Sequence, residues 1–117
     1  MDIPDYAEQL IQEFSDGWNS EILLEKYASW IFVKTCDEAD LKLVCALLRE
    51  KLGSLQHHAG WSVEQKSDCL YFLTTEAIFE KSSAVITFVI FRRFEGDLGL
   101  NGFEIDSETL RVNSANP

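Results

Sequence analysis

The spacing of apolar residues predicts helices in the first half of the chain. Ile3, Tyr6, Leu10 and Phe14 recur at intervals of three and four with acidic residues between them, which indicates an amphipathic helix. Asp16-Gly17 ends this helix, since glycine readily takes the left-handed conformation that follows many helix termini.

Two further helices are predicted. The first is capped by Asn19 or Ser20 and has apolar residues on most of its sides up to Phe32, so we expect it to be largely buried, with Trp30 in the core. The second opens on a capping-box pattern over residues 35–38 and carries an apolar stripe from Leu41 to Leu52.

After Gly53 the apolar period changes from helical to two. We predict four strands, over residues 55–64, 69–79, 84–94 and 98–105, separated by short polar turns. Short turns require antiparallel neighbours, so the sheet is a meander. The predicted fold class is α+β, with N-terminal helices packed on a curved four-stranded antiparallel sheet. It forms a single domain over residues 1–106, followed by a polar C-terminal tail over residues 107–117.

Both faces of the middle strands are apolar. One face of the third strand carries Val85, Val89 and Phe91, and its other face carries Ala84, Ile86, Phe88 and Ile90. Helices can cover one face, and the other would expose an apolar patch that monomers rarely carry. We therefore expect a homodimer that packs sheet to sheet. The predicted interface consists of Ile86, Phe88, Ile90 and Phe72. The alternative is a central third strand wrapped by its own chain.

The charge balance restricts the possible partners. With 20 acidic and 10 basic residues, the net charge is −10, so a nucleic-acid partner and a membrane-surface role are not expected. Such a surface favours a basic protein partner, or serves only to keep the protein soluble. No apolar run is long enough to span a bilayer, and the acidic N-terminus does not resemble a signal peptide, so we expect a cytoplasmic protein.

No catalytic, metal or cofactor motif stands out. Cys36, Cys45 and Cys69 are too widely spaced for a zinc site and odd in number for a disulfide framework. The glycines at 96, 99 and 102 do not precede a helix, so they do not form a nucleotide-binding loop.

One histidine is a candidate for chemistry. His57 falls in the apolar register of the first predicted strand, where it could act as an acid or base next to Tyr71 or Thr75. A cavity lined by His57, Trp61, Tyr71 and Thr75 is the resulting hypothesis. The alternatives are a core histidine bonded to backbone, or a register shifted by a bulge. His58 would point to the opposite face, so the two histidines would not share a metal.

Three short motifs suggest a family resemblance. The helix end at residues 49–53, the strand end at residues 77–81 and the closing strand at residues 100–105 resemble those of bacterial cystatin-like domains near the nuclear-transport-factor-two-like cone folds. The resemblance covers residues 20–106, and it departs where those domains often have a tryptophan and this chain has Leu98 or Leu100. It implies a helix-backed, strongly curved sheet that often dimerises through the sheet, and it implies no activity.

These observations lead to two functional hypotheses. We expect a non-enzymatic interaction domain, an acidic homodimer that binds a protein partner, in one version an immunity or antitoxin protein that neutralises a basic effector. The alternative is a small-molecule-binding or isomerase-like cone-fold protein with its cavity around His57.

Overall fold

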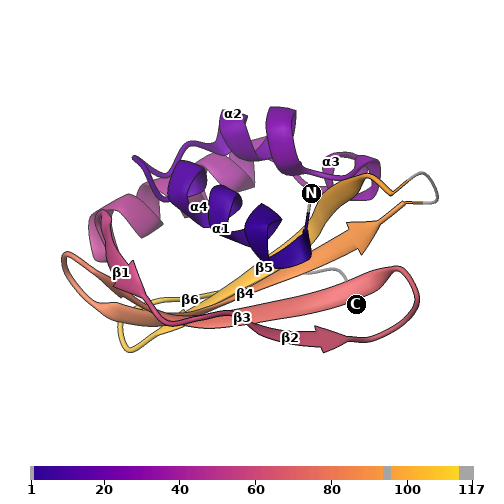
Figure 1. The fold of residues 1–117 in the computed structure, drawn as a ribbon. Helices are drawn as coiled ribbons and strands as arrows, with labels where there is room; N and C mark the ends of the chain where they lie inside the picture. The colour runs from indigo at the N-terminus through magenta and orange to yellow at the C-terminus, as the bar shows by residue number, and fades with distance from the viewer. Residues whose placement is uncertain (1, 94–95, 114–117) are drawn as a thin grey trace.

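Helices cover one face of an open antiparallel sheet in the computed structural model, which describes residues 2–93 and 96–113 (Figure 1). In chain order the elements are α1 (Ile3–Phe14), α2 (Ser20–Ile22), the π-helical turn η1 (Leu23–Tyr27), α3 (Trp30–Thr35), α4 (Glu38–Lys51), β1 (Leu55–His58), β2 (Ser62–Gln65), β3 (Leu70–Phe79), β4 (Ser83–Arg92), β5 (Leu98–Ser107) and β6 (Arg111–Asn113). The predicted α+β class is confirmed. None of the helices in these described ranges is long and apolar enough to cross a membrane.

The predicted first helix is confirmed as α1, whose apolar stripe packs towards the sheet. After the helix, Gly17 takes a φ of +81° and Trp18 a φ of 52°, a conformation that non-glycine residues rarely adopt. The Trp18 side chain compensates for this cost because it is buried against Phe14 and Phe79, and its Nε1 donates a hydrogen bond to the Gly53 carbonyl oxygen at 2.8 Å.

The second predicted helix is divided into α2, η1 and α3. Asn19 caps α2, and the helical path stops at Ala28, where the backbone becomes extended and bridges Leu100 of β5. The Ser29 amide donates to the Leu100 carbonyl oxygen at 2.8 Å, so this segment is held to the sheet instead of continuing a helix. As a result α3 starts in a new direction and Trp30 is 61% exposed, which corrects the prediction that it lies in the core.

The third predicted helix is confirmed as α4, but its cap lies two residues later than predicted. Asp37 is the N-cap, and its side chain accepts hydrogen bonds from the backbone amides of Ala39 and Asp40. Thr35 cannot serve as the cap because it is the last residue of α3, where its hydroxyl donates to the Ile31 carbonyl oxygen.

Among the described residues, the sheet has six strands instead of the predicted four. Its order is β1-β3-β4-β5-β6, with β2 also paired to β3, and all pairings between the strands are antiparallel. The first predicted strand is interrupted over residues 59–61, which separates β1 from β2 along the same edge of β3. Residues 111–113, predicted as part of a polar tail, form β6. Residue 94 of the third predicted strand and residues 114–117 of the tail lie outside the described residues.

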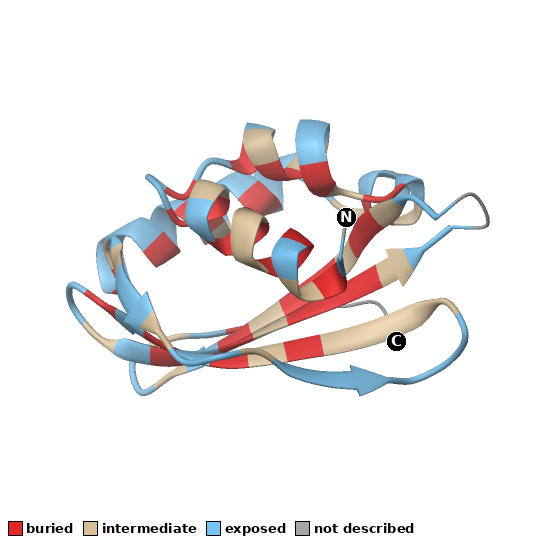
Figure 2. Cartoon of the chain, in the orientation of Figure 1, coloured by how far each residue is buried: buried red, intermediate tan, exposed pale blue. Residues whose placement is uncertain are grey.

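The helices bury one face of this sheet and leave the other open (Figure 2). On β4 the covered face carries Ala84, Ile86, Phe88 and Ile90, each 5% exposed or less. The residues that alternate with these along each strand point to the opposite face of the sheet, which is called here the open face. The helices thus decide which of two apolar strand faces becomes the core.

Candidate functional site

The two neighbouring histidines of β1 occupy opposite faces, in the reverse of the predicted arrangement. A bulge between Leu55 and His57 shifts the register, so that His57 pairs with Ile78 and His58 pairs with Ala77. Since paired residues share a face, His58 points to the helix side and His57 to the open face, where it is exposed. The prediction of an inward His57 is therefore wrong, and the alternative of a shifted register applies.

A polar cluster does form around Thr75 and Trp61, with His58 in place of His57. His58 Nε2 lies 2.8 Å from Glu8 Oε1, and Trp61 Nε1 donates to the same oxygen at 3.2 Å. His58 Nδ1 lies 2.5 Å from the Ala59 carbonyl oxygen and 3.2 Å from Thr75 Oγ1. The cluster joins α1 to the segment that links β1 with β2.

The members of the cluster differ from the predicted cavity residues in two ways. Glu8 is one of the acidic residues between the apolar positions of α1, and no local pattern indicates which strand its carboxylate will meet. Tyr71 lies outside the cluster, on the helix side of β3, and the Arg92 guanidinium lies 5.6 Å from the centre of its ring. Of the four residues predicted to line a cavity, only Trp61 and Thr75 belong to this cluster.

The environment of Glu8 favours its carboxylate form. Burial acts to raise the pKa of Glu8, but hydrogen bonds from Gln12, His58 and Trp61 together outweigh it, and the pKa lies below its ordinary value. The other ring nitrogen of His58, Nδ1, faces the Ala59 carbonyl oxygen.

This arrangement does not build a nucleophile. In an acid–base–nucleophile triad the base nitrogen must accept the hydroxyl proton. Here His58 Nδ1 faces the Ala59 carbonyl oxygen, and the Thr75 hydroxyl gives its proton to that same oxygen at 2.7 Å instead of to the ring. Thr75 is also only 3% exposed. The geometry instead fastens α1 to the sheet.

The open face presents a different kind of surface. Across the strands, one row of paired positions consists of Glu76 on β3, Val85 on β4, Asp106 on β5 and Arg111 on β6. The next row contains His57, Ile78 and Ser83. Val85 is 41% exposed and Ile78 is 44% exposed, so two aliphatic side chains face solvent here.

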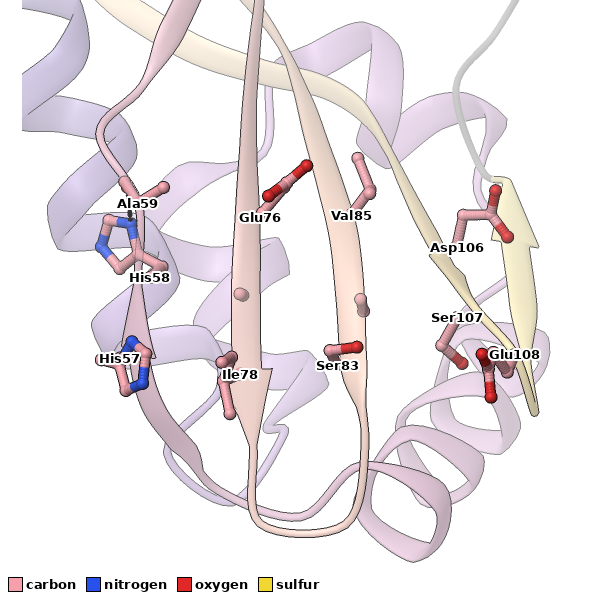
Figure 3. Close-up of a pocket in the computed structure, with 12 residues that line it drawn as sticks. His57, His58, Ala59, Glu76, Ile78, Ser83, Val85, Asp106, Ser107 and Glu108 are labelled. Atoms are coloured by element: carbon pink, nitrogen blue, oxygen red, sulfur yellow. Dashed lines mark hydrogen bonds between the residues drawn. The ribbon is translucent and has the colours of Figure 1, made fainter.

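A groove of about 950 Å³ runs across this end of the open face (Figure 3). Figure 3 shows Glu76, Val85 and Asp106 side by side on three strands, with Glu108 on the turn beyond. Within the described part of the chain, no ion pair joins Glu76, Asp106 or Glu108 to a base. Arg111 pairs with Asp106 in the strand register, but its guanidinium forms an ion pair with Glu104 at 3.5 Å. The groove therefore combines exposed aliphatic surface with three carboxylates that form no ion pair among the described residues.

The predicted dimer interface is mostly on the covered face. Ile86, Phe88 and Ile90 are at most 1% exposed beneath the helices, so in this fold they cannot contact a second subunit, and their assignment is corrected. Phe72 does lie on the open face, where it pairs with Val89, and the Lys66 ammonium lies 5.1 Å from its ring centre.

The chain was compared with models of protein families, with curated proteins and with solved structures, and no match was found. The class of the protein therefore follows from its own structure. It is an α+β protein with one face of an open antiparallel sheet covered by helices and with a groove on the other face, lined in part by Glu76, Asp106 and Glu108.

Proposed function

We propose that this chain is a non-enzymatic protein-interaction domain that binds a basic partner protein through the open face of its sheet. The observation that carries the proposal is the groove, in which exposed Ile78 and Val85 lie among the carboxylates of Glu76, Asp106 and Glu108. Apolar contact gives such a surface affinity, and the surrounding charge selects the sign of the partner.

The charge of the whole chain supports the same partner. Its net charge is −10, so a basic protein is attracted over a distance and an acidic one is repelled. A protein that neutralises a basic effector, of the immunity or antitoxin type, is one biological form of this function.

The cavity hypothesis receives less support. An acid–base activity would need a free proton acceptor next to a reactant. The His58 ring, which replaces His57 on the helix side, is held between Glu8 and the Ala59 carbonyl oxygen. Both of its nitrogens are thus occupied within the fold, and its side chain is only 10% exposed.

We further propose that a second copy packs on the other end of the open face, around Phe72. Leu70, Phe72 and Phe91 are half-buried there next to the buried Val89. The bordering Glu64 and Lys66 form an ion pair with each other at 2.7 Å, so no unpaired charge of these two residues opposes contact with a second copy. Kinship with the cystatin-like and cone-fold domains is part of the same proposal, because those domains often dimerise through the sheet.

The function is tested by capturing partners from a lysate of the native cells with the tagged protein. The groove variant carries Glu76→Gln and Asp106→Asn, and the matched control carries Glu25→Gln and Glu50→Gln on exposed helix positions. We expect the wild type and the control to retain a basic protein that high salt releases, and the groove variant to lose it. Equal capture by the groove variant would contradict the proposal.

A further inference from the structure

We propose that the segment bound in the groove is a basic amphipathic helix that lies across strands β3, β4 and β5. This inference rests on the proposed function and specifies the secondary structure of the partner.

The spacing of the groove residues matches the pitch of a helix. Glu76, Val85 and Asp106 are paired across three adjacent strands. Neighbouring strands lie about 4.8 Å apart, so the two carboxylate positions are separated by roughly 10 Å with Val85 midway between them. An α-helix rises about 5.4 Å per turn, so a helix laid across the strands places one side chain per turn above each strand.

This match defines the chemistry of the helix. Lysine or arginine about two turns apart would stand over Glu76 and Asp106, and an aliphatic residue one turn from each would contact Val85. Ile78, diagonally placed on β3, extends the apolar contact to the next row, and Glu108 lies beyond Asp106 as an additional acceptor for a basic end.

An extended segment fits this groove less well. In a strand the side chains on one face repeat about every 6.6 Å, which is out of step with the strand spacing beneath them. Its backbone N–H and C=O groups would also lose water against Ile78 and Val85 with no partner, because the strands below already pair with each other. A helix satisfies its own backbone and avoids this cost.

The test uses two fluorescent peptides of identical composition. The first is an alanine- and glutamine-based helix with a central leucine flanked by two lysines about two turns apart, and with two prolines at its N-terminal end. The second has the same residues with the two prolines moved to the centre, where they prevent a helix. Fluorescence anisotropy is measured at low and high salt with the wild type, the groove variant (Glu76→Gln, Asp106→Asn) and the control variant (Glu25→Gln, Glu50→Gln).

We expect the helical peptide to bind the wild type and the control at least roughly tenfold more tightly than it binds the groove variant. We also expect it to bind the wild type at least roughly tenfold more tightly than the peptide with central prolines does. If both peptides bind equally and both depend on the groove carboxylates, the helix inference is overturned and the proposed function stands. If neither peptide binds, or if binding is indifferent to the groove variant, both fall. Circular dichroism of each variant verifies that it is folded.

Discussion

His58 Nε2 lies 2.8 Å from Oε1 of Glu8, a contact that links the end of β1 to α1 across 50 positions of sequence. Trp61 donates to the same carboxylate oxygen, so one side chain from the end of β1 and one from the interruption between β1 and β2 converge on one helix residue. This contact holds the helical layer on the edge of the sheet, and it has a pH dependence that can be measured.

Replacing Glu8 by Gln keeps the size of the side chain and an acceptor oxygen but removes the charge. The Glu8 side chain is 45% exposed, so solvent screening keeps the expected loss of unfolding free energy at neutral pH to about 1 kcal/mol or less. Burial acts to raise the pKa of Glu8, but its hydrogen bonds outweigh burial, so the pKa in the folded protein lies below that of an ordinary glutamate. The contribution of this carboxylate to stability is therefore present above the ordinary pKa of a glutamate and disappears as the pH falls through the lower folded value. Urea unfolding of wild type and variant should therefore differ at pH 7, and the difference should shrink at an acidic pH below the ordinary pKa of a glutamate. An equal difference at both pH values would count against this account.

Replacing Gly53 by Ala should destabilise the fold for two reasons. Its φ is +76°, where an L-residue is strained, and an added Cβ would lie 3.0 Å from Glu80 Oε1 and 3.1 Å from Glu80 Cβ. We expect a loss of roughly 1–2 kcal/mol in unfolding free energy. Gly60→Ala is the matched control, since nothing lies within 4 Å of its added Cβ, and we expect its effect to stay within about 0.5 kcal/mol. Equal effects of the two substitutions on the denaturation midpoint would refute the prediction.

Tyr6 should ionise late. Burial raises the pKa of Tyr6 to about 12, although the nearby Arg93 acts to lower it, and its hydroxyl donates to the Tyr27 carbonyl oxygen at 3.0 Å. The unfolded chain ionises this group near its ordinary value, so folded stability should decline as pH rises from about 10 towards 12. Absorbance at the tyrosinate band should show a late transition that Tyr6→Phe removes. A late transition that persists in the variant would assign it to another group.

Phe72→Glu should separate the proposed dimer without affecting the groove. In the variant both copies would carry a carboxylate at this position, next to Leu70 and Phe91 of the interface, where its desolvation is costly. Light scattering at micromolar concentration should give twice the 13.4 kDa chain mass for wild type and the single mass for the variant. The control Phe72→Leu should remain dimeric. A folded wild type of single mass would remove the dimer from the proposal.

Several elements follow from the sequence because local patterns specify them. The stripe of Ile3, Leu10 and Phe14 defines α1 whatever it packs on, and the stripe around Leu41 and Leu48 does the same for α4. The short turns around β4 leave only antiparallel pairing with β3 and β5.

The remaining features required the tertiary structure. Both faces of β4 are apolar, so hydrophobicity did not decide whether Ile86 or Val85 would be covered, and the helices bury Ile86. One extra residue in the bulge between Leu55 and His57 exchanges the faces of the two histidines, because side chains alternate with a period of two. The contact of Glu8 with His58, and the row of Glu76, Val85 and Asp106, join residues distant in the chain. Local patterns determined which segments form helices and strands, whereas sheet register and helix packing decided which side chains meet.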